Sequence, residues 1–163
     1  ARTAHGLGIR SNATLLFGHI ETFAERIDHL HRLRKLQDET KGFMSFIPLP
    51  FHNVGNRMSH LPGPDKNDIL KTLAVSRIYL DNFDHIKAYW IVMGADTAQE
   101  GLSYGANDVD GTVMEEKIYH MAGSKNPQIQ AVEFLRDLIT KAGREPIERD
   151  ALYNIINREK VKI

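Results

Sequence analysis

The stretch ATLLFGHIETFAERIDHLHRLRKLQDETKGFMSFIPLP, residues 13–50, contains a complete strand–helix–strand unit. The apolar run 13–17 ends at Gly18 and is typical of a buried strand. Residues 21–40 predict an amphipathic helix, because apolar side chains recur at three- and four-residue steps: Phe23, Ile27, Leu30, Leu33 and Leu36. Gly42 is the expected C-cap of this helix. Residues 43–49 then form a second apolar run, closed by Pro48 and Pro50.

The same alternation continues to the end of the chain. We expect a loop over 52–66, a helix capped by Asn67 and Asp68, a strand over 86–92, a helix over 95–104, a strand over 109–114, and helices over 126–142 and 148–157. Repeated units of this kind, with continuously apolar strands, predict a parallel α/β sheet covered on both faces. A small doubly wound sheet and half of a (β/α)8 barrel both remain open, since a full barrel needs about 250 residues. No glycine-rich phosphate loop follows the first strand, which weakens the nucleotide-binding version of the doubly wound sheet.

Composition excludes several classes of function. The 163 residues fit one domain, and 21 basic residues balance 21 acidic ones, so no net charge favours nucleic acid or an anionic membrane. No apolar run reaches the roughly 20 residues of a membrane span, and no signal-peptide pattern opens the sequence, so we expect a cytoplasmic protein. The chain has no cysteine, which removes thiol nucleophiles and thiolate metal ligands.

Polar residues follow each predicted strand, at the ends where parallel α/β proteins place their sites. They occur at 18–21, at 48–53, at Tyr89–Trp90 late in the third strand, and at 108–112. Each also has a purely structural interpretation. The first is then a turn before a helix, the second a stiff strand exit, the third a core aromatic, and the fourth a strand-to-helix junction.

The last of these clusters lies in GANDVDGTVMEEKIYHMAG, residues 105–123. Asp108 and Asp110 share one face of a strand, and paired carboxylates suggest a metal or an acid/base site. No histidine or glutamate lies near them at ligand spacing, since His120 comes one helix later, and Glu115 and Glu116 suit the first turn of that helix. For Asp110 to Thr112 a ligand-binding role is favoured, because Gly111 lets a ligand approach the backbone closely.

Five segments, in this order and spacing, carry a resemblance that extends over nearly the whole chain: SNATLLFGHIET, GFMSFIPLPFHNVGN, AVSRIYLDNFDHIKAYW, GANDVDGTVMEEKIYHMAG and AGREPIERDALYNII. They resemble a radical S-adenosylmethionine (SAM) group that comprises aminofutalosine synthase, dehypoxanthine futalosine cyclase and the deazaflavin FO synthase. Within this group, HIKAYW and EPIERDALYN look most like aminofutalosine synthase.

The resemblance implies a (β/α)8 barrel in which a [4Fe–4S] cluster cleaves SAM to a 5′-deoxyadenosyl radical. In aminofutalosine synthase that radical adds to 3-[(1-carboxyvinyl)oxy]benzoate and gives aminodeoxyfutalosine, a menaquinone precursor. The cluster-binding C-x-x-x-C-x-x-C loop belongs to the first barrel strand, and this chain has no cysteine. The chain therefore resembles strands five to eight, is expected to be inactive alone, and needs as partner an N-terminal half-barrel or a second copy of itself.

The resemblance also implies a set of site residues. Those expected to bind SAM are Gly18, His19, Glu21, Pro48 and Leu49. Those expected to bind the substrate are His52, Asn53, Arg57, Trp90, Asp110, Gly111 and Thr112. No catalytic acid or base and no metal ligand is assigned, since in radical chemistry the protein mainly positions and shields.

Two further expectations concern organisation. Residues 1–123 are expected to form the half-barrel and residues 124–163 a helical extension packed on it. Gly18, Pro48, Trp90 and Asp110 should meet at one rim, whereas Asn12 at the opposite rim should be structural. The alternatives are half of a futalosine cyclase or of a deazaflavin synthase, and a non-catalytic β/α module that dimerises.

Overall fold

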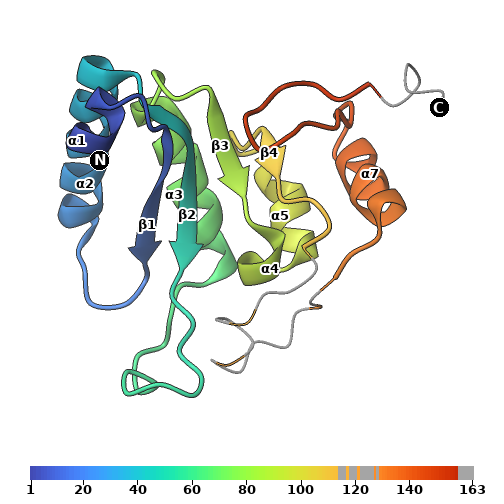
Figure 1. Cartoon of the computed structure of the whole chain (residues 1–163). Coiled ribbons are helices and arrows are strands. Elements are labelled where there is room, and N and C mark those ends of the chain that lie inside the picture. The colour runs from blue at the N-terminus through green and yellow to red at the C-terminus, as the bar shows by residue number, and fades with distance from the viewer. Residues whose placement is uncertain (114–116, 118–120, 122–126, 128, 158–163) are drawn as a thin grey trace.

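A computed structural model describes residues 1–113, 117, 121, 127 and 129–157 (Figure 1). Its parallel sheet has the spatial order β1 (Ser11–Phe17), β2 (Phe43–Pro50), β3 (His85–Ala88) and β4 (Asp108–Val109). The helices are α1 (Arg2–Gly6), α2 (Phe23–Thr40), α3 (Lys66–Tyr79), α4 (Trp90–Met93), α5 (Ala95–Gly101) and α7 (Val132–Lys141). In the described part of the chain, no helix is both long enough and apolar enough to cross a bilayer.

The strand order decides between the two architectures that the sequence leaves open. A doubly wound sheet reverses its strand order at a switch point, and helices then cover both faces. Here the order in space follows the order in the chain, and α2, α3 and α5 lie on one side of the sheet (Figure 1). The α/β class is confirmed, and the arrangement is that of consecutive β/α units in one half of a (β/α)8 barrel.

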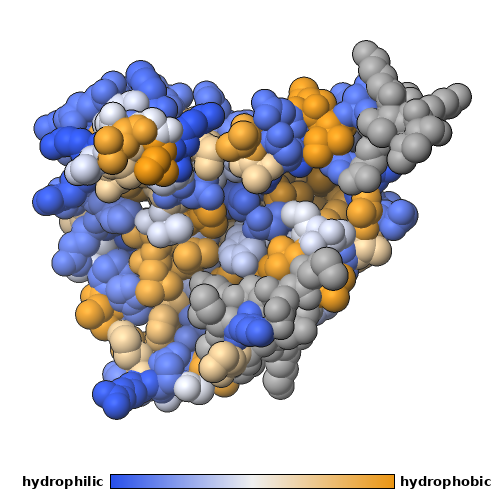
Figure 2. Space-filling view, in the orientation of Figure 1, coloured by the Kyte–Doolittle hydropathy of each residue, from blue (hydrophilic) through white to orange (hydrophobic). Residues whose placement is uncertain are grey.

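The other face of the sheet is uncovered along β1, whereas residues 149–155 pack over its β3 and β4 part. In β1 the side chains of Ala13, Leu15 and Phe17 are buried against the helices, whereas Leu16 on the opposite face is 49% exposed. Hydrophobic side chains therefore gather on the open side over β1 and β2 (Figure 2). The expectation of strands buried on both faces is wrong for β1, because successive side chains point to opposite faces and only one face of this strand has helices against it.

The core lies between the sheet and its helices. Phe17, Phe46, Leu73 and Ile86 are each fully buried there. The predicted apolar stripe of α2 is only partly in this core: Leu30 is 2% exposed, but Phe23 is 72% and Ile27 37% exposed. These two side chains belong to the first turns of α2, which follows the edge strand β1.

Two helix caps differ from the predicted ones. Lys41, at φ 52°, takes the left-handed conformation expected of Gly42. Gly42 is instead required by packing, since a Cβ there would lie 2.1 Å from the His5 ring. The N-cap of α3 is Asp65, whose carboxylate accepts the N–H of Asp68, so the cap predicted at Asn67 and Asp68 is displaced by two residues.

The third and fourth strands are shorter than predicted. β3 ends at Ala88, and the helix α4 begins at Trp90, so Trp90 does not lie in a strand. A short buried helix and a buried strand both read as an apolar run, which is why periodicity does not separate them. β4 is Asp108–Val109 rather than 109–114, and α5 ends at Gly101 rather than at 104. Residue 114, Glu115, Glu116 and His120 lie outside the described residues.

The C-terminal segment is not a helix over 148–157, as the sequence predicts. Arg149 and Ile155 form an antiparallel bridge, and the Asp150 carboxylate accepts the N–H groups of Leu152 and Asn154. Tyr153 has φ 67°, a left-handed conformation that no helix contains. Side chain–backbone bonds of this kind compete with helix formation. The preceding helix, α7, begins at Val132 instead of at the predicted 126.

Candidate functional site

The predicted rim exists as the end of the sheet at which all four strands have their carboxyl-terminal residues. Gly18 directly follows β1, Pro48 lies near the end of β2, Trp90 follows β3, and Asp110 follows β4. Because the strands are parallel, these four residues are at the same edge, as predicted. At the opposite edge, the Ser45 hydroxyl donates to the Asn12 side-chain oxygen at 3.1 Å, which fits the structural role expected of Asn12.

The turn after β1 is organised around the carboxylate of Glu21. That carboxylate accepts the N–H groups of Gly18 at 2.5 Å and His19 at 3.0 Å, and Arg26 Nε at 2.7 Å. Its own backbone N–H is a further donor. A carboxylate has about four acceptor sites, so Glu21 is saturated by the protein and shapes the turn. A ligand at this turn would meet its backbone rather than the Glu21 carboxylate.

These contacts set the ionisation of Glu21. Burial alone favours the neutral acid and raises the pKa. The hydrogen bonds from the Gly18 and His19 backbone and from Arg26 outweigh burial and lower the pKa from 4.5 to about 2. Glu21 is therefore ionised throughout the physiological range.

Gly18 and His19 complete this turn. Gly18 has φ 86°, and a Cβ on it would lie 2.5 Å from the Pro64 ring, so glycine is required both by conformation and by packing. The His19 ring accepts the N–H of Ile20 at 2.7 Å through Nδ1 and meets the Phe51 ring edge-on at 5.9 Å. The turn thus packs directly on residues of the loop that follows β2.

The exit of β2 is a section of backbone with few donors. The pairing of β2 with β3 ends at Phe46 and Ile86, so Pro48 and Leu49 lie beyond the last residue paired with β3, although both still pair with β1. Pro48 and Pro50 have no N–H group. Carbonyl oxygens dominate such backbone, which suits a flat ligand that donates hydrogen bonds.

The loop over residues 51–65 contains three of the predicted substrate-binding residues, and their side chains differ in burial and in hydrogen bonding. His52 has a buried Nε2 without a hydrogen-bond partner among the described residues. The Asn53 side-chain amide donates to the carbonyls of Leu61 at 2.8 Å and Pro62 at 3.1 Å, so it closes the loop. Arg57 is exposed. His52 is thus the member of this group with an unmet polar atom.

Trp90 is 1% exposed and belongs to the core. Its indole N–H donates to the backbone carbonyl of Asp110 at 3.1 Å. The sequence places Trp90 on a strand and facing a ligand. In the structure it begins α4 and anchors the residue that follows β4.

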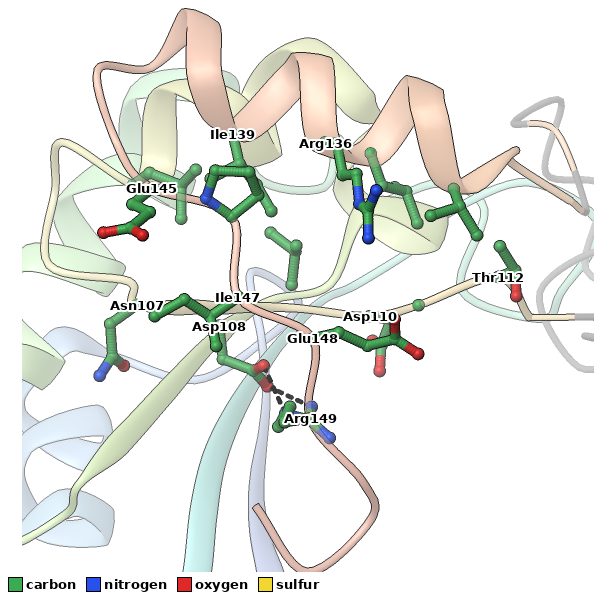
Figure 3. A pocket seen from close by; sticks show the side chains of 16 residues that line it. Asn107, Asp108, Asp110, Thr112, Arg136, Ile139, Glu145, Ile147, Glu148 and Arg149 are labelled. Carbon is green, nitrogen blue, oxygen red and sulfur yellow. Dashed lines mark hydrogen bonds and ion pairs between the residues drawn. The ribbon is translucent and has the colours of Figure 1, made fainter. Parts of the chain in front are cut away.

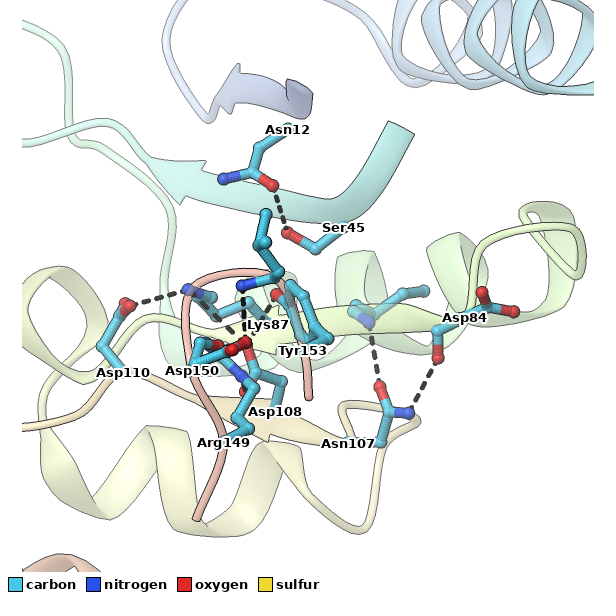
Figure 4. Close-up of polar contacts among 12 residues, drawn as sticks. Asn12, Ser45, Asp84, Lys87, Asn107, Asp108, Asp110, Arg149, Asp150 and Tyr153 are labelled. Atoms are coloured by element: carbon cyan, nitrogen blue, oxygen red, sulfur yellow. Dashed lines mark hydrogen bonds and ion pairs between the residues drawn. The ribbon is translucent and has the colours of Figure 1, made fainter. Parts of the chain in front are cut away.

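Asp110 belongs to a charged group on the open face of the sheet, here called the interior cluster: Lys87, Asp108, Asp110, Arg149 and Tyr153 (Figure 4). The Lys87 ammonium lies 2.7 Å from Asp110 and 3.5 Å from Asp108. Arg149 donates two hydrogen bonds to Asp108, at 2.9 and 2.7 Å, and the Tyr153 hydroxyl donates a third at 3.1 Å. Asp108 and Asp110, which the sequence places on one face of a strand, therefore share the ammonium of Lys87.

Burial opposes every charge in this cluster. It lowers the pKa of Lys87, but the two aspartates outweigh it and the net pKa is raised, so Lys87 is a cation. Burial raises the pKa of Asp110 against the opposing pull of Lys87. Each of these charges has a partner of opposite sign, so removal of one partner would leave an uncompensated buried charge.

Tyr153 is held in place from both sides. Its ring stacks on His85 with centroids 3.8 Å apart, and the Arg149 guanidinium lies 4.0 Å from its ring centroid. Residues 149–155 thereby reach the end of the sheet at which β3 begins. Contacts of this kind offset the strain of a left-handed Tyr153.

A cavity of about 370 Å³ opens beside β4, between that strand, α7 and residues 145–149 (Figure 3). Asp110, Gly111 and Thr112 line it, together with Arg136. A Cβ at Gly111 would have no atom of the described residues within 4 Å, so these residues leave room for a ligand to approach its backbone. The remaining predicted substrate residues, His52, Asn53, Arg57 and Trp90, do not line this cavity.

Sequence reasoning missed Arg26, Lys87, Arg149 and Tyr153. Lys87 interrupts an apolar run, and that is a usable signal of a buried, paired charge. The other three lie in segments whose partners come from distant parts of the chain, for example 41 residues between Asp108 and Arg149. Among the described residues, no three histidine, aspartate or glutamate side chains converge on a possible metal site.

Comparison with known proteins finds relatives in the group of enzymes that the sequence resembles. Over 93% of its length the chain is 56% identical to an aminodeoxyfutalosine synthase from Thermus thermophilus, covering 42% of that protein. It is 43% identical to a 5-amino-6-(D-ribitylamino)uracil–L-tyrosine 4-hydroxyphenyl transferase from Archaeoglobus fulgidus, over 96% of the chain and 46% of that protein. It is 39% identical to a cyclic dehypoxanthine futalosine synthase from Streptomyces coelicolor, over 92% of the chain and 37% of that protein.

The chain thus spans less than half the length of these relatives, at 42%, 46% and 37% of each. The family model described as the CofH/MqnC C-terminal region matches residues 40–162, and the chain belongs to this family.

Proposed function

We propose that this chain is the substrate-side half of an aminodeoxyfutalosine synthase. In that reaction the 5′-deoxyadenosyl radical from SAM adds to 3-[(1-carboxyvinyl)oxy]benzoate in menaquinone biosynthesis. The observation that carries the proposal is the 56% identity with the Thermus thermophilus aminodeoxyfutalosine synthase, against 43% and 39% for the transferase and the cyclic synthase. The chain is expected to be inactive alone.

A [4Fe–4S] cluster would supply the electron that cleaves SAM. No thiolate in this chain can ligate it, because the chain has no cysteine. In the proposal the cluster is therefore held by the other half of the protein. This chain would contribute the Gly18–His19 backbone, in the shape fixed by Glu21, and the Pro48–Leu49 backbone beyond the last β2–β3 pair. Because Glu21 binds the N–H groups of Gly18 and His19 and Pro48 has no N–H, a nucleoside would form its hydrogen bonds with backbone carbonyls here.

Substrate recognition would fall to two places at the same edge. The buried and unpartnered Nε2 of His52 can donate to a carboxylate of the substrate, and Arg57 on the same loop can add a charge-assisted bond. Asn53 would keep the loop closed. At the other place, Asp110, Gly111 and Thr112 line the cavity beside β4, and Trp90 fixes the position of Asp110.

The partner in this proposal is an N-terminal half-barrel, on the same polypeptide or on a separate one. β1 and β4 are both edge strands of the described sheet, and the face of β1 that points away from the helices is exposed. Apolar surface is exposed at Leu16 in β1, at Ile20 in the turn after it and at Phe23 at the start of α2, by 49%, 73% and 72%. Unpaired edges and apolar surface of this kind call for cover, which four further β/α units would provide. A second copy of this chain is the alternative occupant.

The organisation of the chain is part of the proposal. Residues 1–123 would belong to the barrel and residues 124–163 would form an extension packed on it, in a cytoplasmic protein. The packing of Leu135 and Leu138 of α7 into the common core supports the contact between the two parts.

The test is a reconstitution. The chain is combined with an N-terminal half that carries the C-x-x-x-C-x-x-C loop, loaded anaerobically with iron and sulfide, reduced, and given SAM and 3-[(1-carboxyvinyl)oxy]benzoate. We expect aminodeoxyfutalosine, detected by mass spectrometry. Cleavage of SAM without this product would reject the substrate and direct the test to the substrates of the other two classes. A stable homodimer that does not bind SAM, even with the other half present, would identify a non-catalytic module.

A further inference from the structure

Arg26 is the most extensively bonded buried cation on the helix side of the sheet. Its side chain is 10% exposed and lies between two carboxylates, Glu21 and Asp68. Nε donates to Glu21 at 2.7 Å. The two terminal nitrogens form a bidentate pair with Asp68 at 2.7 and 3.0 Å, and one of them also donates to the Thr72 hydroxyl at 3.1 Å.

The rest of the guanidinium is enclosed by aromatic rings. Its central carbon lies 4.9 Å from the ring centroids of both Phe17, the last residue of β1, and Phe23, the first residue of α2. Arg26 therefore contacts the end of β1, the turn after it, its own helix and the first turn of α3. A planar fork with fixed donor directions makes such a set of contacts possible, and a lysine ammonium does not.

The segments that Arg26 connects are the two proposed binding elements. Glu21 shapes the Gly18–Glu21 turn, and Asp68 belongs to the turn of α3 that ends the 51–65 loop. A second contact joins the same segments, because Gly18 packs so closely on Pro64 that a Cβ would lie 2.5 Å from its ring. The turn and the loop are thus joined at two independent points.

We propose that Arg26 is a positioning residue that holds the Gly18–Glu21 turn and the 51–65 loop in one fixed relation. That these elements bind SAM and substrate rests on the proposed function, but the connection between them does not. In the complete enzyme, a nucleoside on the turn would face the substrate on the loop at a distance set by Arg26. Arg26 touches neither ligand in this scheme and acts through Glu21 and Asp68.

Limited trypsin digestion tests the connection without any enzymatic activity. Arg57 and Lys66 are cleavage sites within the loop and at the start of α3, and cleavage there requires local opening. We expect Arg26→Gln to accelerate cleavage at these two sites about tenfold, the effect of about 1.4 kcal/mol of local opening free energy. Arg32→Gln is the matched control: it removes one arginine from the same helix, but its ion pair with Asp28 is 77% exposed on the arginine side. Its cleavage rate should equal that of the wild type.

Two further variants keep the proposal testable if Arg26→Gln does not fold. Asp68→Asn retains the size of the side chain and weakens only the α3 end of the connection, so we expect a smaller acceleration of about threefold. Arg26→Lys keeps the charge but loses the fork, and should be cleaved nearly as fast as Arg26→Gln. Wild-type cleavage rates in Asp68→Asn and Arg26→Lys would overturn the proposal.

The reconstituted enzyme gives a second readout. There we expect Arg26→Lys to raise the KM for SAM and for the substrate together, and Arg32→Gln to leave both unchanged. If wild-type enzyme makes no aminodeoxyfutalosine, the proposed function fails, while the trypsin result still decides on Arg26. An altered KM for one ligand alone, with wild-type cleavage of the loop, would show that Arg26 does not join the two elements.

Discussion

Replacing Glu21 by glutamine tests the electrostatics of the turn after β1. The variant keeps the shape of the side chain but removes the charge that accepts the N–H groups of Gly18 and His19 and the Arg26 guanidinium. The pKa of Glu21 falls from 4.5 to about 2 on folding, which corresponds to at most about 3.4 kcal/mol at 1.36 kcal/mol per unit. The side chain is 12% exposed, and some solvent screening brings the expected loss to about 2 kcal/mol.

The pH dependence of this loss follows from the direction of the shift. Since the folded pKa lies below the unfolded one, the stabilisation is fully present above about pH 4.5 and disappears as the pH falls toward 2. The difference between wild type and Glu21→Gln should therefore shrink from about 2 kcal/mol at pH 7 to about 1 kcal/mol at pH 3.

Urea unfolding at the two pH values measures this difference, with Trp90, the single tryptophan of the chain, as the fluorescent reporter. Glu39→Gln, whose carboxylate is 48% exposed, serves as the control and should change the free energy of unfolding by less than about 0.5 kcal/mol. An equal loss for Glu21→Gln at both pH values would refute the reasoning, because the effect would then not come from ionisation.

Three other outcomes are expected. Lys87→Met leaves two buried carboxylates without their shared cation and should lower the free energy of unfolding by about 3 kcal/mol or more. Its control, Lys141→Met, removes an exposed ion pair and should change the free energy of unfolding by less than about 0.5 kcal/mol. Similar losses for the two variants in urea titrations would contradict the buried pairing. Gly18→Ala places a methyl group against Pro64 at a left-handed φ and should lower the melting temperature. Gly111→Ala should leave the melting temperature unchanged and weaken substrate binding in the reconstituted enzyme. An unchanged melting temperature for Gly18→Ala would count against the packing of Gly18 on Pro64. Tyr153→Phe removes one hydrogen bond to a buried carboxylate and should lower the free energy of unfolding by about 1–2 kcal/mol; no loss in urea titrations would show that this bond does not contribute.

Local periodicity predicts the first half of the fold well. The strand–helix–strand unit of residues 13–50 follows from apolar spacing, and α2 and β2 end within one or two residues of the predicted positions. Trp90 shows the limit of this signal, because the apolar run around it continues from a strand into a short buried helix without a change of composition.

Residues 148–157 show a second limit. Their apolar spacing suits a helix, but Asp150 binds nearby N–H groups and Tyr153 stacks on His85, so the native conformation is decided by contacts that local sequence does not contain. The site divides in the same way. The sheet edge that collects Gly18 and Asp110 follows from topology, whereas the pairing of Asp108 with Arg149 depends on tertiary structure alone.

The position of Arg149 in the chain has a consequence for synthesis on the ribosome. Asp108 leaves the peptidyl-transferase centre 41 residues before the arginine that neutralises it, a delay of roughly 2–8 s at ordinary elongation rates. During that interval Asp108 in β4 and Asp110 after it share one cation, Lys87 of β3, and Asp108 lacks its arginine partner. Among the described strands, β4 would therefore be the one that completes its ion pairs latest, and a ribosome stalled before Arg149 would hold a chain in which Asp108 lacks its arginine.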